Sequence, residues 1–494
     1  MNRLKIIILF SLYLHNTMQA QTKFGNEMCI GLHGYNLKYE NPNYQHDTLQ
    51  IPFRTFLRSR SNICDSTGSM ILLSDGGNIY DRDGGLIENG DTLTPTSWYN
   101  EYFGISPAIQ SSVFLPMVNR KYYFVTPTMN DTQFYYSKNI HPWKAPFNEI
   151  LYNVIDMNAN GGNGKVTKRM VPILENKEMT KTCMQACRHS NGKDWWLFKQ
   201  GGDSTIGNVL YKFLFTQDSV YNMGMQIIPF PFRGYFDLWG QMAFSPDGKK
   251  WASTVCNNSD GEVYIADFDR CTGVLSNFEK KNIWPNPTGF PLPNLQADSI
   301  NAGLCFSPNG KMLYVSRYSH IVQLNLQNNS QYKVTGMDTT YNYFMGYIVL
   351  QLGPDNKIYI GHKDGFSRQM NTIDNPDVPG AGCNFCKKCL QSVYKNEVLY
   401  SPPNMPNYEL GADLPCWPLG IDAVKRNEED FVVYPNPAST ILYIKTDLNK
   451  VRELYNSVGQ LIMSTEGNEL NVAGLSQGVY CLKCSNKIRK VIIE

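Results

Sequence analysis

Short hairpins dominate the pattern of apolar and polar positions along the chain. In residues 241–254 the apolar stretch QMAF is followed by the turn SPDGKK and a second apolar stretch, WAST. The same order recurs in GLCFSPNGKMLYVS at 303–316, VLQLGPDNKIYIGH at 349–362 and MILLSDGGNIYD at 70–81. Gly, Asn and Asp tolerate the positive φ of tight turns, and proline presets one turn position. The pattern therefore predicts repeated antiparallel hairpins.

The hairpins recur at a spacing that is typical of propeller blades. Looser copies lie at 111–126 and 187–199, and several copies are followed by another short strand pattern. Those following patterns lie at 208–215, 262–269 and 321–327. Hairpins with a third strand, repeated about every 45 to 60 residues, indicate blades. The predicted fold class is all-β: a β-propeller of about seven blades, six visible as copies and one completed from both chain ends. Unrelated hairpins in a β-sandwich are the alternative.

The pattern changes near the C-terminus. Residues 414–430, LPCWPLGIDAVKRNEED, show no strand alternation and end in charged positions, so we interpret them as a linker. Residues 431–494 alternate again, enough for a small Ig-like β-sandwich of six or seven short strands. The propeller would then occupy residues 21–413.

Residues 1–20 are predicted to be a secretory signal peptide. Arg3 and Lys5 precede the apolar run at 6–14, and the small Ala20 precedes Gln21, where we place the cleavage. A membrane anchor would need about 20 apolar residues, roughly twice this run. No other long apolar stretch follows, so we expect the mature chain to have no transmembrane segment.

Composition fits an extracellular β protein and excludes one class of partner. Charged residues make up 18% and aromatic residues 13% of the chain, with 30 Tyr. With a formal charge of +2 and no polybasic run, the chain has no strong positive electrostatic field that would attract nucleic acid. We therefore expect no nucleic-acid binding. The 13 cysteines, read in an oxidising compartment, tend towards disulfides, and their odd number leaves at least one unpaired.

The C-terminal segment resembles the type A-like sorting domain of type IX secretion cargo. Four motifs occur in the family's order and approximate spacing: VYPNP at 433–437, LYNSVGQLI at 454–462, LSQGVYCLK at 475–483 and KVIIE at 490–494. The positions that carry the match are Tyr434, Pro435, Asn436, Pro437, Gly459, Gly478, Tyr480 and Lys490. The resemblance implies passage across the outer membrane through the type IX secretion machinery, after which the domain is usually cleaved. The cargo would be secreted or held at the cell surface, by way of the periplasm.

Residues from about 29 to 411 resemble, less sharply, the propeller-like N-terminal region of large exported, gliding-associated surface proteins. The similar stretches include LLSDGGNIYDRDGG, HSNGKDWWLF, QMAFSPDGKKWAS and the closing AGCNFC to PPNMPNYELG. The resemblance implies a β-propeller in an exposed location, and it implies no reaction.

The cluster CNFCKKC contains two overlapping C-x-x-C units, formed by Cys383, Cys386 and Cys389. Such units can begin a zinc or iron–sulfur site, with Cys416 or His362 as a possible fourth ligand. Export favours disulfides, so we expect no metal and no cofactor. The candidate disulfide cysteines are Cys271, Cys305, Cys383, Cys386, Cys389 and Cys416. Of the pairings, Cys271 with Cys305 is the one that the expected strand geometry favours.

The sequence contains no catalytic motif, since it has neither G-x-S-x-G nor H-E-x-x-H. We therefore expect no catalytic residue and favour a binding or adhesion protein whose extracellular ligand, a glycan or a protein, is unknown. The alternative is a propeller-type hydrolase or lactonase with a central-channel site. Trp98, Tyr99 and Tyr341, which we expect in loops at the surface, are the candidate binding aromatics. Trp196 and Trp251 are expected in the core because alternation buries every second strand residue.

Overall fold

The computed structural model divides the chain into two compact units, Met1–Cys416 and Trp417–Glu494, which are described separately. The structure describes residues 23–31, 34–40, 43–48, 60–102, 108–139, 146–203, 207–230, 240–254, 262–283, 301–317, 320–335, 347–362, 368–394, 398–413, 416, 431–445, 451–456, 460–484 and 487–494. Of these described residues, 56% lie in strands and 6% in helices. The predicted all-β class is confirmed.

The first unit is built from antiparallel sheets whose strands follow one another in chain order. Two three-stranded sheets come first: β1 (Glu27–Cys29), β2 (Tyr35–Glu40) and β3 (Asn43–Thr48), then β4 (Ser61–Cys64), β5 (Met70–Ser74) and β6 (Ile79–Asp81). A seven-stranded sheet contains β7 (Val113–Pro116), β8 (Lys121–Thr128), β9 (Phe147–Asp156), β10 (Lys165–Arg188), β11 (Trp195–Asp203), β12 (Gly207–Phe215) and β13 (Val220–Ile227).

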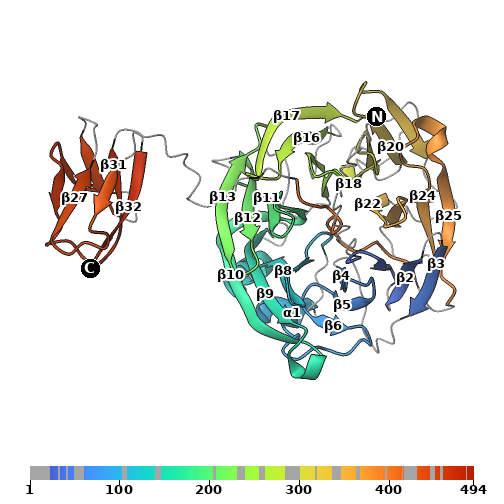
Figure 1. Cartoon of the computed structure of the whole chain (residues 1–494). Coiled ribbons are helices and arrows are strands. Elements are labelled where there is room, and N and C mark those ends of the chain that lie inside the picture. The colour runs from blue at the N-terminus through green and yellow to red at the C-terminus, as the bar shows by residue number, and fades with distance from the viewer. Residues whose placement is uncertain are drawn as a thin grey trace, which may run out of the picture. The chain divides into compact units, whose positions relative to one another are not determined.

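Three four-stranded sheets complete the unit. They are β14 (Met242–Phe244), β15 (Lys250–Thr254), β16 (Glu262–Asp269) and β17 (Val274–Asn282); β18 (Asn301–Phe306), β19 (Met312–Arg317), β20 (His320–Asn325) and β21 (Gln331–Thr335); and β22 (Tyr347–Leu352), β23 (Ile358–His362), β24 (Gln369–Ile373) and β25 (Phe385–Gln391). Figure 1 shows the sheets arranged radially around a common centre, with β18, β22 and β4 close to it and β13, β17 and β25 at the outside. The fold is propeller-like.

Strand β10 belongs to two groups of strands. Its first part pairs with β9, for example Val166 with Ile155, and its last part pairs with β11, for example Cys187 with Trp196. Met179 lies at the change, because it pairs with residues of both neighbours. The seven-stranded sheet is thus two four-stranded groups that share one long strand.

The repeated turns explain why these segments form hairpins. In SPDG the Ser245 N–H donates to Lys250 O (2.9 Å), and Gly248 has a φ of 70°. Gly310 of SPNG also has a φ of 70°, and Asn356 of GPDN has a φ of 63°. Each of these positions needs left-handed backbone, which Gly and Asn adopt most readily. The hairpin at 70–81 has a different place in its sheet: it joins the second and third strands, β5 and β6, whereas the other three join the first and second strands.

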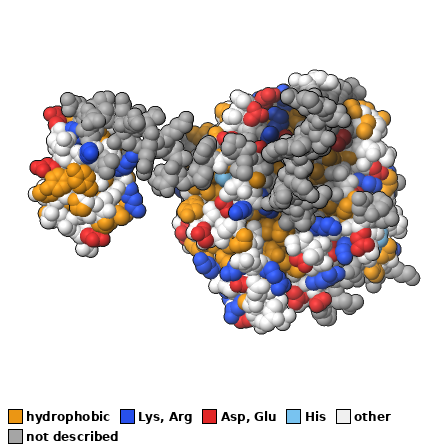
Figure 2. Space-filling model, in the orientation of Figure 1, with side chains coloured by type: hydrophobic (Ala, Val, Ile, Leu, Met, Phe, Trp, Pro, Cys, Tyr) orange, Lys and Arg blue, Asp and Glu red, His pale blue; other side chains and the backbone are white. Residues whose placement is uncertain are grey.

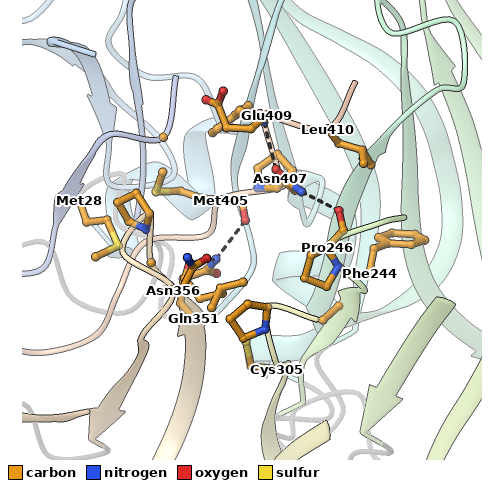
Figure 3. Close-up of a pocket in the computed structure, with 18 of the residues that line it drawn as sticks. Met28, Phe244, Pro246, Cys305, Gln351, Asn356, Met405, Asn407, Glu409 and Leu410 are labelled. Atoms are coloured by element: carbon orange, nitrogen blue, oxygen red, sulfur yellow. Dashed lines mark hydrogen bonds between the residues drawn. The ribbon is translucent and has the colours of Figure 1, made fainter. Parts of the chain in front are cut away.

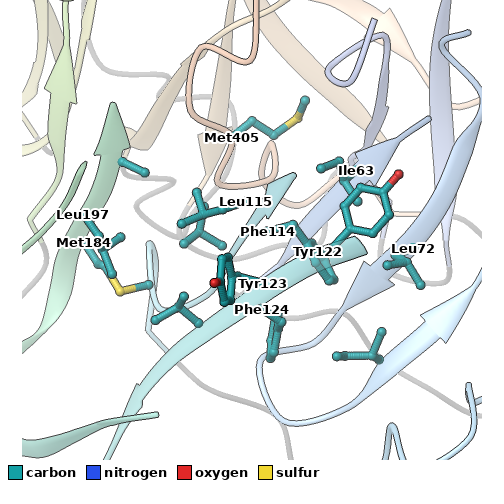
Figure 4. Close-up of a cluster of buried hydrophobic side chains, with 14 of the residues drawn as sticks. Ile63, Leu72, Phe114, Leu115, Tyr122, Tyr123, Phe124, Met184, Leu197 and Met405 are labelled. Atoms are coloured by element: carbon teal, nitrogen blue, oxygen red, sulfur yellow. The ribbon is translucent and has the colours of Figure 1, made fainter. Parts of the chain in front are cut away.

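The core lies between neighbouring sheets. The outermost strand of a sheet is largely exposed, as in β13, whereas all six residues of β19 are buried. Trp196 and Trp251 are both fully buried in one cluster, which confirms that they belong to the core. A second cluster joins β4 and β5 to β7, β8, β10 and β11, and it includes Met405 (Figure 4).

Helices are few and short in the described part of the first unit. They are α1 (Thr96–Tyr102), α2 (Asp131–Asn139) and the 3₁₀ turns η1 (Asn160–Gly162) and η3 (Gly380–Cys383). Among the residues with described coordinates, no helix is long and apolar enough to cross a membrane. Basic and acidic side chains are interspersed over the face shown in Figure 2.

The second unit contains two antiparallel sheets. One is formed by β26 (Val432–Tyr434), β27 (Ile441–Lys445) and β30 (Glu469–Asn471), and the other by β29 (Leu461–Thr465), β28 (Arg452–Tyr455), β31 (Gly478–Cys484) and β32 (Lys487–Ile493). Both sheets contribute to one apolar core, with Leu442 from the first and Leu454 and Leu482 from the second.

Candidate ligand-binding site

The segment that follows the last sheet, residues 398–413, crosses the centre of the first unit (Figure 1), and we name it the strap. It has no helix or strand of its own. It begins beside the first sheet, where the Tyr400 N–H donates to Ile30 O (3.0 Å) and Leu399 forms a bridge with Gly31. The strap therefore joins the end of the first unit to its beginning.

Asn404 fixes the strap at the centre. Its Nδ2 donates to the carbonyl oxygens of Ser112 (2.9 Å) and Met184 (3.3 Å), and its Oδ1 accepts from Gln185 Nε2 (3.0 Å). Its backbone N–H donates to Arg60 O (2.8 Å). The cavity beside it measures only about 10 Å³, roughly the space of one water molecule. The strap thus occupies the centre of the unit, around which the innermost strands are arranged.

Buried glutamines link the innermost strands directly. Gln241 Oε1 accepts from the N–H groups of Leu304 (3.2 Å) and Leu350 (3.1 Å), and its Nε2 donates to Leu350 O (2.7 Å). Gln110 exchanges two hydrogen bonds with the backbone of Met242 (2.8 and 2.9 Å). Both side chains are buried. These bonds satisfy backbone groups that strand pairing leaves open, so they hold neighbouring sheets in position.

A pocket of about 830 Å³ opens beside the strap (Figure 3). Three equivalent turns contribute to its wall, each through the apolar residue before the turn and the proline within it. These pairs are Phe244 and Pro246, Phe306 and Pro308, and Leu352 and Pro354. Strap residues Met405 and Leu410 line it as well, and Met28 comes from the first sheet. The repeated sequence motif thus builds the wall of a pocket of ligand-binding size.

Amide side chains hold the strap against this wall. Gln351 Nε2 donates to Met405 O (3.3 Å), and Asn407 Nδ2 donates to Pro246 O (2.8 Å). The Asn407 Oδ1 accepts from the Glu409 N–H (3.0 Å). All these groups appear together in Figure 3. The pocket shape therefore depends on the strap as much as on the sheets.

Glu409 is a carboxylate of the strap, and the Arg188 guanidinium is the charged group that acts most strongly on it. Burial raises the pKa of the Glu409 carboxyl to about 7, although the Arg188 guanidinium acts against this shift. Burial also lowers the pKa of Arg188 to about 10. Arg188 donates to Gly192 O (2.8 Å) and Tyr408 O (3.1 Å), and its guanidinium lies 4.4 Å from the ring centroid of Trp195. The buried Glu409 Oε2 has no hydrogen-bond partner among the described residues.

Replacing Glu409 by Gln should remove a pH dependence of stability. The folded chain holds this carboxyl protonated up to about pH 7, whereas an unfolded chain ionises it near 4.5. The wild type should therefore lose stability as pH rises from about 4.5 to about 7. At pH 8 we expect the variant's Tm to exceed that of the wild type by about 2 °C or more, with no such gain at pH 4. Thermal unfolding at both values measures this.

Met405→Leu is the control for that measurement, since Met405 lines the same pocket from the strap and has no ionisable group. We expect the control to shift Tm equally at pH 4 and pH 8. A Glu409→Gln variant with the same Tm difference at both pH values would show that this carboxyl is not held in its protonated form.

The described lining of the pocket offers contact groups of few kinds. Its carboxylates are Glu40 and Glu409, and its thiols are Cys187 and Cys305. Burial raises the pKa of each thiol to about 12, so both are protonated at neutral pH. Ring faces, prolines and amides suit contacts with a polar ligand that has apolar faces. Within the described ranges, no three His, Cys, Asp or Glu side chains converge as metal ligands.

The predicted binding aromatics do not form this site. Trp98 is buried in α1, where its ring packs edge-on against Phe134 (6.0 Å) and Phe147 (5.4 Å), so its assignment to the surface is wrong. The short helix α1, which stands where a loop was predicted, turns the indole inward. Tyr99 is partly buried and donates to Asn78 Oδ1 (3.3 Å). Tyr341 lies outside the described residues.

The cysteines pair differently from the expected pattern. Cys271 bonds to Cys416, with 5.5 Å between the Cα atoms, and the expected pairing with Cys305 is wrong. Cys305 is buried within β18, whereas Cys271 lies in the turn after β16, close to the end of the strap. Cys386 bonds to Cys389. Cys383 is a free, buried thiol.

Asn436 has a structural role in the second unit. Its Nδ2 donates to Lys490 O (2.9 Å), and its Oδ1 accepts from the Ile492 N–H (2.8 Å). These two bonds hold the short segment between β26 and β27 against the last strand, β32. Within that segment, Pro435 and Pro437 flank Asn436. The Lys490 side chain itself is exposed.

The other motif positions of the second unit lie on its strands. Tyr434 is exposed and stacks on Tyr443, with ring centroids 5.7 Å apart. Gly478 begins β31, and Tyr480 is buried and donates to Ser476 O (2.8 Å). Gly459, Ala20 and Gln21 lie outside the described residues, as does the side chain of His362.

The geometry defines a class of all-β protein, with a propeller-like unit followed by a small two-sheet unit. Residues 432–494 match the family model described as a secretion system C-terminal sorting domain. The protein is therefore cargo of type IX secretion, exported to the cell surface or the extracellular space. Among the curated proteins, none is similar enough to count as a match.

Similar solved structures include several that are distant in sequence. A candidate 6-phosphogluconolactonase from Bacteroides uniformis is 13% identical, with a TM-score of 0.40, over 76% of this chain and 98% of that one. Apo AztD from Citrobacter koseri is 10% identical, with a TM-score of 0.36, over 76% and 97%. The Swd1 β-propeller domain from Myceliophteria thermophila is 9% identical, with a TM-score of 0.30, over 77% and 96%. At these scores the similarities carry no argument about function.

Proposed function

We propose that this protein is a cell-surface or secreted β-propeller that binds an extracellular ligand, a glycan or a protein, in the pocket beside the strap. The observation that carries the proposal is the pocket of about 830 Å³, whose wall comes from three equivalent turns and the strap. A wall of aromatic rings, prolines and amides is suited to recognition, since apolar faces supply contact area and a few polar groups supply orientation.

Seven blades are the count that the topology supports. If the seven-stranded sheet is two blades sharing β10, the first unit has seven groups of strands. The described N-terminal residues supply a three-stranded first blade. The described C-terminal residues add the bridge from Leu399 to Gly31 and the hydrogen bond from the Tyr400 N–H to Ile30 O. The second unit, with two sheets around one core, would be the Ig-like sandwich.

The parts of the chain then have separate roles in delivery. Residues 1–20 act as the signal peptide, 21–413 as the binding propeller, 414–430 as the linker and 431–494 as the sorting domain that the type IX machinery handles. The alternative, a hydrolase or lactonase with a central-channel site, gains no support from the centre, where Asn404 and its hydrogen-bond partners lie.

Binding of the purified mature chain to glycan and protein arrays tests the proposal. For a ligand found there, we expect Tyr39→Ala and Leu410→Ala, which remove pocket-lining side chains, each to weaken binding about tenfold, the equivalent of one lost apolar contact. Val274→Ala on the exposed edge strand β17 is the control and should bind like the wild type. Failure to bind any array member, or unchanged affinity in both pocket variants, would overturn the proposal.

A further inference from the structure

The disulfide between Cys386 and Cys389 closes a small loop on an outermost strand. β25 is an edge strand whose pairing with β24 shifts register: Thr372 faces Cys386, whereas Met370 faces Leu390. The residues between the two cysteines therefore bulge out of the ladder, as in a β-bulge. The bulge lies at the outer side of the sheet (Figure 1) and lines no part of the pocket.

The two sulfur atoms of this disulfide are accessible to different degrees. Cys389 is exposed and Cys386 is half-buried. By contrast, Cys383, three residues earlier, is buried and remains a free thiol. Thiol–disulfide exchange requires a thiolate to reach one sulfur of the bond, so Cys389 is the sulfur that an incoming thiolate would attack.

Two lysines stand between the cysteines and make the loop cationic. Lys387 is exposed and Lys388 is half-buried. A nearby ammonium group lowers the pKa of a thiol and so makes it a better leaving group in exchange.

The backbone of the loop can keep its conformation when the disulfide opens. Lys388 has a φ of 59°, a conformation that costs a side-chain-bearing residue free energy. Its N–H donates to Asn371 Oδ1 (2.7 Å), which helps to hold it in place. Strand β10 has the same kind of bulge without a disulfide, since Met170 has a φ of 49° and its N–H donates to Asn153 Oδ1 (2.8 Å). The bulge of β25 can therefore remain when the disulfide opens, so opening does not require the strand to refold.

We propose that Cys386 and Cys389 form a thiol-exchange site that accepts electrons from small thiols of the glutathione type. The thiolate of one glutathione attacks Cys389 Sγ; the bond to Cys386 Sγ breaks, and Cys386 leaves as a thiolate that takes up a proton. A second glutathione thiolate attacks the glutathione sulfur of the mixed disulfide and releases Cys389 as a thiolate, which is also protonated. Two thiols are thereby oxidised to one disulfide, and one protein disulfide is reduced to two thiols.

The test is a redox titration of the mature protein in glutathione buffers, read by differential alkylation and peptide mass spectrometry. We expect the Cys386–Cys389 disulfide to open at a ratio of [GSH]² to [GSSG] at least about tenfold lower than Cys271–Cys416 does. Cys383 should resist alkylation throughout because it is buried. Opening of Cys386–Cys389 only together with Cys271–Cys416, or only in denaturant, would overturn the proposal.

A second measurement isolates the role of the lysines. The double variant Lys387→Gln, Lys388→Gln should open several-fold more slowly with glutathione and also with uncharged 2-mercaptoethanol, since the leaving thiolate loses its cationic neighbours. The control is Lys311→Gln, an exposed lysine in the turn between β18 and β19, which should leave the rate unchanged. Equal rates for the double variant and the wild type with both thiols would overturn the assigned role of the loop charge.

Discussion

A chain that ends at Asp430 is expected to disappear from the cell surface and the medium and to accumulate in the periplasm. It keeps the whole first unit, which ends at Cys416, and loses the segment that matches the sorting family. The first unit has its own apolar clusters and both disulfides, so we expect the truncated chain to fold. Cell fractionation with immunodetection of the first unit measures the loss, which should be nearly complete.

A single substitution should reproduce a small part of this loss, because the hydrogen bonds that it removes are exposed and water can partly replace them. Asn436→Leu removes both hydrogen bonds that hold the segment between β26 and β27 to β32, and it leaves the Ile492 N–H and Lys490 O without these partners. Asn456→Ala is the matched control, since that half-buried asparagine bonds to Gln460 within its own turn. Normal export of the chain ending at Asp430 would contradict the role assigned to the second unit.

The sequence alone was sufficient to predict the features of the fold that local chemistry determines. The turns at 245, 307 and 353 were predictable because Gly248, Gly310 and Asn356 supply left-handed backbone at equivalent positions. The burial of Trp196 and Trp251 was predicted from strand alternation, but their strand neighbours Trp195 and Ala252 are buried as well, because both faces of these strands are covered. The pocket wall could also have been noticed, because an apolar residue and a proline recur at the same place in each turn.

The rest depends on contacts between residues far apart in the chain. Asn404 bonds to groups 219 to 292 positions away, and no local pattern marks an asparagine between prolines as the centre of a ring. The pairing of Cys271 with Cys416 likewise follows from where the strap ends, 145 positions later. Trp98 was misplaced for a different reason, since the short helix α1 has little amphipathic pattern to reveal which side faces the core.

The largest stability effect is expected from Asn404→Leu. The substitution keeps the approximate volume but leaves the Ser112 and Met184 carbonyls and the Gln185 amide without these partners in a buried site. Each unsatisfied buried polar group costs about 1 to 3 kcal/mol, so the free energy of unfolding should fall by about 3 to 5 kcal/mol. Denaturant unfolding of the purified first unit, as the chain ending at Asp430, measures this loss without a contribution from the second unit.

Asn407→Ala tests whether the loss of stability is specific to the central hydrogen bonds of Asn404 or follows from the loss of any strap contact. Asn407 lies three residues further along the strap and is exposed, and its Nδ2 bonds to Pro246 O at the pocket wall. Its loss should cost about 1 kcal/mol or less, because water can replace the exposed hydrogen bond. If the strap only covers the ring, both variants should lower the free energy of unfolding by a similar small amount. If the Asn404 side chain holds two separate segments of the ring together, only its replacement should destabilise the whole unit, with the sheets unfolding in one transition at lower denaturant.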